Sequence, residues 1–435
     1  MKRVESVCYS FNINGEVKEF VVPKRGIRQG DPLSPYLFLL CSEGFSNLLK
    51  SAEENKQITG LKISRNGPRL THLFFVDDSL IFCKADTKHA EQLRRILETK
   101  ANSSGQLINL EKSSVFFSKN MEHSKKLEVC CRLENFQMVN QGKYLGLPMV
   151  ITRTKDQIFG FIRDNIKKNL GSWKQKLLSQ AGKEVLLKAV TQAMPTYAMS
   201  CFKLPLKLCK ELSAMMARYW WGDNDGKDKM HLCSWKRITQ AKNQGGLGFK
   251  DLVNFNRALL GKQIWRMLVN PNLLASKVLK AKYYPTGSIF KSKCPQNASW
   301  IWQSLRGATQ KVEEGTWKKI GNGTSTDIWE DKWIVGNKEG RPSTTKPPEC
   351  KVQKVQDLIT HKRWNKVVVL RTFNGRDAEK ILSIPISLAG KEDSNFWIHS
   401  PMGHYTVNTG YKVLMKATVI QERNGNAGAG TSRHS

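Results

Sequence analysis

The sequence has neither the paired cysteines of a zinc site nor an apolar run long enough to cross a membrane. Its ten cysteines include no pair separated by two residues, and His231–Cys233 and His399–His404 stand as isolated pairs. This spacing does not match structural zinc sites and predicts reduced thiols in an intracellular, non-secreted protein. No stretch of 18 apolar residues occurs, and the charged residues 1–5 do not resemble a signal peptide. We therefore expect no membrane partner.

Acidic residues are also scarce. Against 70 Lys and Arg stand 37 Asp and Glu, which gives a formal net charge of +33 and a pI of about 9.8. A chain with this charge repels itself unless a polyanion screens it, and nucleic acid is the usual partner. A basic ribosome-associated or membrane-surface protein is the alternative. Residues 151–290 hold 25 Lys and Arg against 8 Asp and Glu, so the excess is concentrated there and binding should weaken steeply with salt.

The first 150 residues predict a mixture of strands and helices. Alternating apolar residues on both sides of Asn14-Gly15 predict a β-hairpin, and Ser34 as N-cap before Pro35 predicts a largely buried helix to about residue 52. Further elements are expected as two apolar strands joined at residues 77–79, a helix capped by Asp86 or Thr87, and strands near 107–109 and 115–118. This order predicts an α+β fold.

Beyond residue 150 the pattern becomes mainly helical. Apolar residues recur at helical spacing, Pro195 interrupts them, and lysines occupy the outer faces. Tryptophans lie among these lysines, where they either stack on bases or form a core, and we favour the core for most of them. The expected segments are 1–150, 151–221, a basic Trp/Gly-rich module 222–335, a linker 336–350, a segment 351–415 and a disordered tail 416–435.

Adjacent carboxylates at Asp77 and Asp78 are the strongest chemical feature. Two ionised carboxylates about 4 Å apart repel by roughly 4 kcal/mol at an effective dielectric near 20. Mg²⁺ would relieve this repulsion, since it prefers hard oxygen ligands from one or two carboxylates together with substrate phosphates. The alternative is an ordinary polar turn, but apolar strands on both sides favour a metal-binding site.

A second feature is the basic, glycine-punctuated loop Arg25–Pro35 that opens a helix. Glycine allows a ligand to approach the backbone closely, and a helix N-terminus favours phosphate. The alternative is an ordinary loop before a capped helix.

Together these segments resemble the reverse transcriptases of LINE-type non-LTR retrotransposons, in particular the plant lineage. Arg25–Pro35 is similar to the second palm block and Phe75–Asp78 to the catalytic aspartate pair. The next two blocks resemble residues 104–113 and the primer-grip segment Lys143–Pro148. Downstream, residues 173–221 resemble the helical thumb, and residues 396–407 resemble the lead-in to a zinc module.

The resemblance implies an RNA template and a DNA primer as partners, Mg²⁺ as cofactor and no other small molecule beyond the nucleotide. Asp77 and Asp78 would be the catalytic residues and metal ligands. The remaining implied site residues bind nucleotide and template (Arg25, Gln29, Gly30 and Lys112) or form the primer grip (Tyr144, Leu145 and Gly146). The fold would be a partial palm over residues 1–150 followed by a thumb over 151–221. Nuclear or ribonucleoprotein-associated location is what the family suggests.

Two departures qualify these implications. The first palm block, with a third catalytic aspartate, would lie upstream of this sequence, as would the fingers. Val76 stands where the family usually has alanine. We therefore expect that the isolated chain does not polymerise, because loss of a ligand commonly costs orders of magnitude in rate. The alternatives are a non-catalytic nucleic-acid-binding remnant and a product that does not fold stably.

Overall fold

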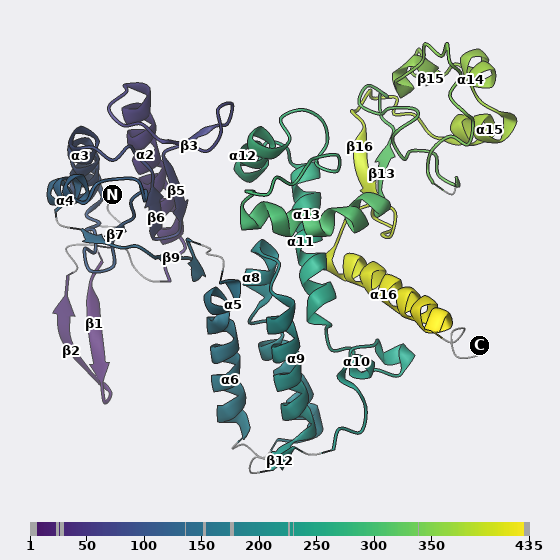
Figure 1. Ribbon diagram of the computed structural model, residues 1–435. Helices are drawn as coiled ribbons and strands as arrows, with labels where there is room; N and C mark the ends of the chain where they lie inside the picture. The colour runs from purple at the N-terminus through teal and green to yellow at the C-terminus, as the bar shows by residue number, and fades with distance from the viewer. Residues whose placement is uncertain are drawn as a thin grey trace. The chain divides into compact units, whose positions relative to one another are not determined.

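The computed structural model describes residues 7–22, 26, 30–134, 136–150, 154–174, 178–224, 227–228, 230–337 and 339–429. The chain divides into two compact units, Met1–Val150 and Ile151–Ser435. Each β-sheet among the described residues has two strands. Strand pairs and helices alternate in the first unit, and helices predominate in the second (Figure 1). The α+β prediction is confirmed.

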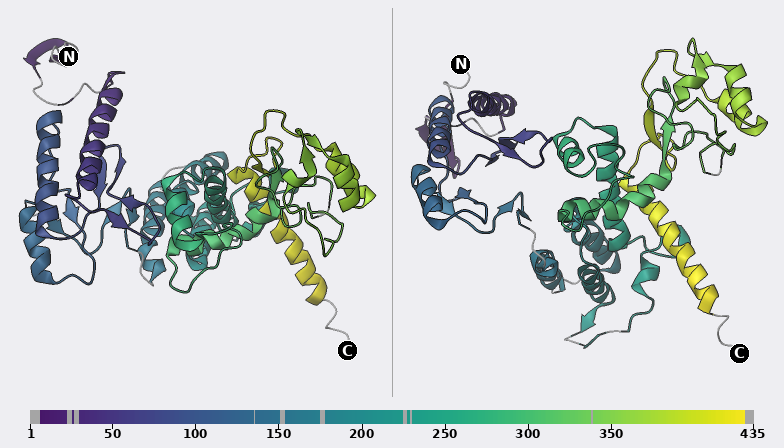
Figure 2. Two further views of the ribbon diagram at one scale, coloured as in Figure 1. Left: turned by 90° about the horizontal axis from the view of Figure 1, so that it is seen from above. Right: turned by 45° about the horizontal axis from the view of Figure 1, so that its top comes forward.

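The first unit is built around its longer helices, and α3 packs against both α2 and α4 (Figures 1 and 2). In chain order, its described elements are β1 (Tyr9–Ile13), β2 (Glu16–Val21), α2 (Ser34–Glu54), β3 (Leu61–Lys62), β4 (Arg69–Leu70), β5 (His72–Phe75), β6 (Asp78–Ile81), α3 (Thr87–Ser104), β7 (Ser114–Val115), α4 (His123–Arg132), β8 (Gln137–Met138), β9 (Lys143–Tyr144) and β10 (Leu147–Pro148).

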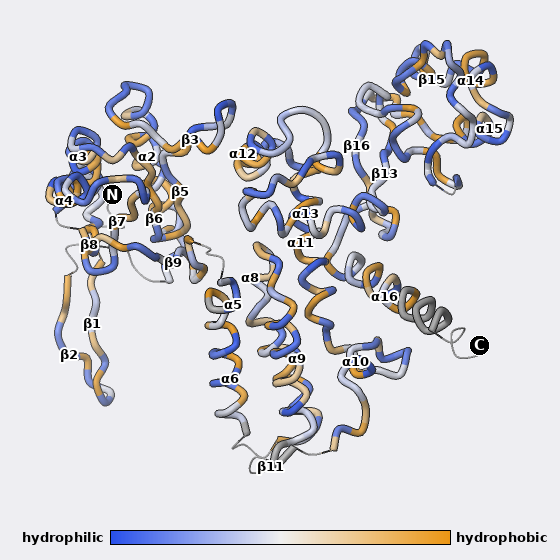
Figure 3. Tube along the Cα trace, viewed as in Figure 1, coloured by the Kyte–Doolittle hydropathy of each residue, from blue (hydrophilic) through white to orange (hydrophobic). Residues whose placement is uncertain are grey.

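The predicted hairpin at Asn14-Gly15 is confirmed as β1–β2. Both turn residues have positive φ, 53° and 91°, which is the type I′ pattern that matches the twist of two antiparallel strands. Apolar residues lie along both strands (Figure 3), yet the whole hairpin is exposed, with Phe11 55% and Phe20 76% accessible. The alternating pattern therefore predicted the hairpin but not its exposure. We call the exposed hairpin β1–β2 the apolar ribbon.

Helix α2 begins one residue before the expected position. Leu33 is the N-cap and Ser34 is already helical, because the Asp31 carboxylate accepts a hydrogen bond from the Leu33 amide and fixes the preceding turn. The expectation of a largely buried helix is wrong for its first half. Tyr36, Leu39 and Leu40 are exposed, and burial begins at Phe45.

The strand expected near residues 107–109 is absent. Residues 105–109 form neither helix nor strand, and the Asn109 side chain instead accepts a hydrogen bond from the Lys112 amide. Such local bonding competes with strand pairing. The next strand, β7, is confirmed only at Val115, and it pairs in parallel with β8. By contrast, Asp86 caps α3 as expected, since its carboxylate accepts from the His89 amide.

The second unit is mainly helical, as expected. Its described elements are α5 (Lys155–Ile158), α6 (Gly160–Lys174), α7 (Gln180–Leu186), a π-helix (Leu187–Thr191), α8 (Thr196–Cys201), α9 (Leu206–Trp221), β11 (Asp223–Asn224), β12 (Lys227–Asp228), α10 (Trp235–Ile238), a 3₁₀ helix (Lys242–Gln244), α11 (Leu252–Val269), α12 (Leu274–Tyr283), α13 (Trp300–Gly315), β13 (Thr316–Lys319), a second 3₁₀ helix (Val355–Leu358), β14 (Ile359–Thr360), β15 (Arg363–Trp364), α14 (Lys366–Thr372), α15 (Gly375–Ser383), β16 (Ser394–Trp397) and α16 (Val407–Ala429).

The tryptophans form cores rather than exposed stacking platforms. None of the 12 is exposed, and six are buried: Trp220, Trp265, Trp302, Trp317, Trp333 and Trp397. The rings of Tyr283 and Trp302 stack with their centroids 4.6 Å apart and their planes 4° from parallel, so neighbouring aromatic side chains complete this packing. The core interpretation of these residues is confirmed.

Residues 316–397 have a hydrophobic core of their own, in which Trp333, Val355 and Ile381 are buried. The described residues of the expected linker, 336–337 and 339–350, form no helix or strand, but hydrogen bonds hold this segment to the core. Its Ser343 hydroxyl and the Thr344 amide and hydroxyl donate hydrogen bonds to the buried Asp377 carboxylate.

The tail expected at 416–435 is helical over much of its length. Helix α16 extends to Ala429, and its C-terminal half projects away from the rest of the second unit in each view (Figures 1 and 2). The first half of α16 packs against α11. Once that half is nucleated, each further residue adds a hydrogen bond at little cost. Residues 430–435 lie outside the described residues.

A buried asparagine joins α8 and α11. The Asn256 side chain is 2% exposed. Its NH₂ group donates hydrogen bonds to the carbonyl oxygens of Met199 at 2.7 Å and Phe202 at 2.9 Å. Its Oδ1 accepts a hydrogen bond from the Leu204 backbone amide at 2.8 Å. Replacing Asn256 with alanine is expected to cost about 3 kcal/mol, because three buried groups lose their partners. Urea unfolding followed by tryptophan fluorescence measures this loss.

The matched control is Asn270→Ala at the exposed C-terminal end of the same helix. Its expected cost is below about 0.5 kcal/mol, as for most surface substitutions. Equal destabilisation by the two variants would show that the Asn256 hydrogen bonds contribute nothing specific.

Candidate active site

The tight hairpin β5–β6 presents both aspartates. Phe75 pairs with Asp78, so Val76 and Asp77 form a two-residue turn. Val76 has φ of +52°, a conformation that β-branched residues rarely adopt and that costs roughly 1–3 kcal/mol. Both carboxylates are exposed. The hairpin therefore presents two adjacent carboxylates to solvent.

The base of this hairpin is fixed to helix α2. The rings of Phe74 and Phe45 stack with their centroids 5.0 Å apart and their planes 6° from parallel. The two ring nitrogens of His72 lie 2.9 Å from the hydroxyl oxygens of Ser46 and Thr71. A neutral imidazole can donate to one hydroxyl and accept from the other, so both bonds form at once. These contacts position the strand that carries the aspartates.

Burial favours the neutral form of this imidazole. It lowers the pKa of His72 from its ordinary value of 6.5, and the nearby Lys50 charge lowers it further, against the opposing carboxylates of Glu53 and Glu43. His72 was missed in the sequence because a lone histidine before an apolar strand carries no recognisable spacing.

A second hairpin brings the expected primer-grip tyrosine close to the aspartates. Leu145 and Gly146 form the β9–β10 turn with φ of +49° and +76°, the type I′ pattern. Tyr144 precedes this turn. Burial raises the pKa of Tyr144, and the charge of Asp78 raises it further, so the phenol and the carboxylate are electrostatically coupled. The structure thus brings together residues 66 positions apart in the sequence.

The other expected site residues are not joined to the aspartates. Arg25 and Gln29 lie outside the described residues. Gly30 is exposed with φ of +84°, and no atom lies within 4 Å of where its Cβ would be. Lys112 is exposed in a turn, where only its backbone amide is bonded, to Asn109. Across the described parts of the chain, no hydrogen bond or ion pair links Lys112 to Asp77 or Asp78.

The donor set at the turn fits Mg²⁺. The ion is usually held by one or two carboxylates, with waters and substrate phosphates completing its octahedron, and two exposed carboxylates meet that requirement. Among the described residues, no group of three or more His, Cys, Asp or Glu side chains is arranged to hold a metal. A metal held by Asp77 and Asp78 would therefore need further oxygen ligands.

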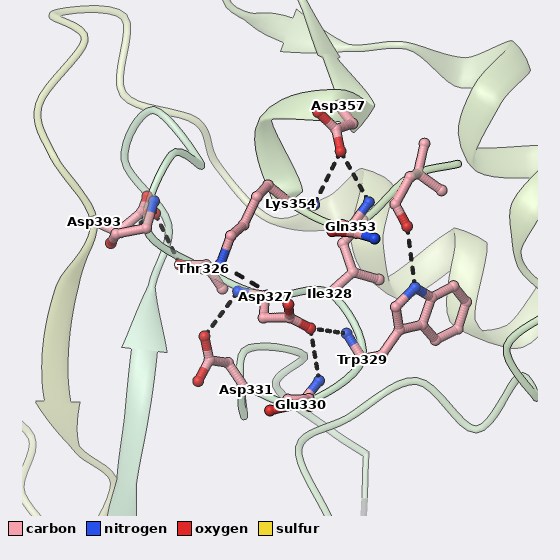
Figure 4. Close-up of polar contacts among 12 residues, drawn as sticks. Thr326, Asp327, Ile328, Trp329, Glu330, Asp331, Gln353, Lys354, Asp357 and Asp393 are labelled. Carbon is pink, nitrogen blue, oxygen red and sulfur yellow. Dashed lines mark hydrogen bonds and ion pairs between the residues drawn. The ribbon is translucent and has the colours of Figure 1, made fainter. Parts of the chain in front are cut away.

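Acidic side chains in the second unit serve the fold instead (Figure 4). Asp327 accepts from the amides of Trp329 and Glu330, and Asp357 accepts from those of Gln353 and Lys354. Asp393 accepts from the amides of Gly321, Gly323 and Ser325. Because backbone donors occupy these carboxylates, they fasten loops and leave little capacity for a metal.

Helices of the described chain are each too short or too polar to span a bilayer.

Comparison with known proteins places the hairpin site in a family. Residues 2–149 match the family model described as reverse transcriptase (RNA-dependent DNA polymerase). An uncharacterized mitochondrial protein of Arabidopsis thaliana is 38% identical over 144 residues, which is 33% of this chain and 94% of that protein.

Two longer relatives also match. A protein of the same plant named "Putative ribonuclease H protein" is 30% identical over 280 residues, 62% of this chain and 44% of its own length. A 149 kDa uncharacterized protein of transposon TX1 from Xenopus laevis is 26% identical over 204 residues, 45% of this chain and 15% of its own length. The chain thus spans less than half of each longer relative. It belongs to the reverse transcriptase family, with residues 2–149 as its reverse transcriptase domain.

Proposed function

We propose that this chain is part of the RNA-directed DNA polymerase of a LINE-type non-LTR retrotransposon of the plant lineage. The observation that carries the proposal is the β5–β6 turn, which presents Asp77 and Asp78 beside Tyr144 inside the matched domain. The transposon and plant relatives support it. Residues 1–150 would be the palm, 151–221 the thumb and 222–335 a basic module, with 351–415 leading toward a zinc module.

The proposed site residues would fall into three groups, which bind the metal, the nucleotide and template, and the primer. Asp77 and Asp78 would hold Mg²⁺, which supplies activation of a primer 3′-hydroxyl and stabilisation of the leaving pyrophosphate when two ions are bound. Tyr144, Leu145 and Gly146 would support the primer end next to those carboxylates. By resemblance, Arg25, Gln29 and Gly30 would shape the nucleotide and template site, and Lys112 would face the triphosphate.

We propose further that these 435 residues alone do not polymerise. They supply two of the three carboxylates that the resemblance implies, and a missing electrostatic group commonly costs about 10²–10³ in rate. A longer polypeptide that contributes the third carboxylate would restore the site. Binding of an RNA template would place the chain in a ribonucleoprotein, and the family suggests a nuclear location.

Primer extension tests the proposal. The purified chain, with Mg²⁺, an RNA template and a DNA primer, is expected to give no extension above that of Asp77→Ala/Asp78→Ala. Joining the chain to an upstream segment that carries an aspartate palm block is expected to restore extension that the double variant lacks. Extension by the chain alone would contradict the inactivity, and failure of the joined protein would contradict the polymerase assignment.

The second candidate is a non-catalytic nucleic-acid-binding remnant, which the concentration of positive charge in residues 151–290 favours. It predicts binding that weakens steeply with salt and is unchanged by the aspartate substitutions. A third candidate, an unstable product, is favoured by the exposed apolar ribbon β1–β2. Near-UV circular dichroism separates the first two candidates from the third, because a molten chain lacks the near-UV signal of fixed aromatic side chains.

A further inference from the structure

Three lysines from distant parts of the sequence meet in the second unit. Lys188 lies on the π-helix, Lys250 on the loop that leads into α11, and Lys412 on α16. Helices α11 and α16 pack against each other (Figure 1). Lys188 contacts the segment just before Lys250, since its ammonium donates to the Leu247 carbonyl and lies over the Phe249 ring. Lys412 directly follows Tyr411, whose ring lies under the Lys250 ammonium. We call these residues the Lys188–Lys250–Lys412 cluster.

The Lys250 ammonium is held in place by aromatic rings. It lies 4.7 Å from the centroid of Tyr411 and 6.0 Å from that of Phe255, two rings that meet edge to face at 86°. The Lys250 amide donates to Gln192 Oε1 at 3.3 Å, which fixes the backbone as well. Cation–π contacts orient an ammonium without neutralising its charge. Lys250 is therefore positioned before any ligand arrives.

Lys188 is positioned equally well. Its ammonium donates to the Leu247 carbonyl at 2.5 Å and to Glu184 at 2.6 Å, and it lies 5.1 Å from the centroid of Phe249. Glu184 also pairs with Lys242 at 3.4 Å, so this one carboxylate is shared between two cations. Positive charge remains in excess around Lys188.

The cluster has no carboxylate of its own to balance Lys250 and Lys412. Within the described residues, neither lysine has an acidic group at ion-pair distance. Asp251 is adjacent in sequence, but its carboxylate caps α11 by accepting from the Asn254 amide at 2.8 Å. Burial, followed by the charges of Lys188 and Lys412, lowers the pKa of Lys250. An anion bound among the three ammonium groups would relieve their repulsion.

Two buried polar atoms beside Lys188 lack partners in the described structure. They are Thr191 Oγ1 and Gln192 Nε2, and their side chains are 2% and 5% exposed. Thr191 ends the π-helix, an element that occurs frequently at functional sites. Gln192 also contacts the cluster through its Oε1, which accepts a hydrogen bond from the Lys250 amide.

We propose that the Lys188–Lys250–Lys412 cluster binds one phosphate group of a nucleic-acid backbone, an inference that rests on the proposed nucleic-acid function. A phosphate offers oxygens in several directions, which suits ammonium groups arriving from three separate elements, whereas a carboxylate offers two in one plane. Contacts of this kind fix the position of a strand without reading its sequence. The site would locate a nucleic-acid strand on the second unit, independently of Asp77 and Asp78.

Salt-dependent binding tests this proposal. Lys250→Met keeps the apolar stem on Tyr411 and removes the charge. Fluorescence anisotropy with labelled single-stranded and duplex oligonucleotides is expected to show roughly fivefold weaker binding, with the slope of log K against log salt reduced by about 0.7–0.9. Lys412→Met should act similarly. The control, Lys277→Met on the exposed face of α12, removes the same charge elsewhere and is expected to change the slope less.

Inorganic phosphate distinguishes the two sources of this ligand chemistry. At matched ionic strength, phosphate rather than chloride is expected to raise the melting temperature of the unsubstituted chain and not that of Lys250→Met. A phosphate shift without a change in oligonucleotide slope would assign the site to free phosphate and overturn the backbone proposal. Equal slopes for Lys250→Met and Lys277→Met, together with no phosphate shift, would overturn the site altogether. An unsubstituted chain that shows the phosphate shift but binds no oligonucleotide would count against the proposed function and the backbone proposal together, whereas oligonucleotide binding that Lys250→Met leaves unchanged would count against the cluster alone.

Discussion

Replacing Gly410 with alanine is expected to destabilise the second unit by roughly 3–5 kcal/mol, near the upper end of single substitutions. Tyr405 is 2% exposed, and its hydroxyl donates to the Ala258 carbonyl at 3.0 Å. A Cβ at Gly410 would meet that hydroxyl oxygen at 1.9 Å and the ring carbon Cζ at 2.4 Å. The opposite side offers no room, because a Cβ at Gly261 on α11 would lie 2.4 Å from the same hydroxyl. The ring can move only by separating α16 from α11.

The matched control is Gly171→Ala on α6, where no atom lies within 4 Å of the added Cβ. Alanine there should stabilise the protein by about 0.5–1 kcal/mol, because glycine loses more backbone entropy in a helix. Thermal unfolding followed by circular dichroism compares the two variants. If Gly410→Ala is as stable as Gly171→Ala, the packing of Tyr405 between the two glycines is not what holds α16.

Replacing Asp377 with alanine is expected to unfold the region of residues 316–397, at a cost of roughly 3–5 kcal/mol. The Asp377 side chain is fully buried and accepts from the Asn337 amide at 2.9 Å, the Ser343 hydroxyl at 3.0 Å, and the amide and hydroxyl of Thr344 at 2.8 and 2.7 Å. Alanine would leave these donors without an acceptor. Tryptophan fluorescence should report the change, because Trp333 lies in the same core.

The same carboxylate predicts an acid-sensitive region. Burial acts to raise the pKa of Asp377, but hydrogen bonds from Thr344, Asn337 and Ser343 outweigh it and hold the pKa below the ordinary value of 3.8. A carboxyl group with a depressed folded-state pKa contributes stability that is fully present above its unfolded pKa and is lost as the pH falls through the folded value. Stability should therefore fall as the pH drops below about 4.

Asp377→Asn separates charge from shape in this experiment. The amide fills the same space but titrates nowhere in the acid range, so its unfolding free energy should vary less between pH 5 and pH 2 than that of the unsubstituted chain. The pH dependence that remains would come from other carboxylates with lowered pKa values, among them Asp393, whose hydrogen bonds lower its pKa against the effect of burial. Parallel acid profiles for the two proteins would contradict a role for Asp377.

Local features of the sequence predicted local structure well. Asn14-Gly15 predicted a type I′ hairpin because only residues that tolerate positive φ fit both turn positions, and Asp86 predicted the start of α3 because its carboxylate satisfies a free helix amide. The hairpin of two apolar strands was predicted in the same way, but its connection was expected at residues 77–79. The turn is instead Val76–Asp77, because Phe75 pairs with Asp78 and β6 already begins at Asp78. Each of these rests on contacts within a few positions of the chain.

Predictions that depended on distant partners fared less well. The first half of α2 is as apolar as its second half, yet only the second half meets α3, so sequence could not distinguish them. The segment near 107–109 has a strand-like pattern, but the Asn109 side chain forms a competing turn. The tail at 416–429 has the glycines of a disordered segment, while the packing of α16 on α11 nucleates a helix through it.

The sequence by itself determined the family, the aspartate pair and the excess of positive charge, because those properties reside in residue identity and short spacing. Only the tertiary structure decided that Tyr144 lies within reach of the Asp78 charge, that His72 connects the β5–β6 hairpin to α2, and that Lys188, Lys250 and Lys412 converge. The physical reason is that electrostatic coupling and packing depend on distance in space. The chain sets that distance only after its helices and hairpins have buried their apolar faces against one another.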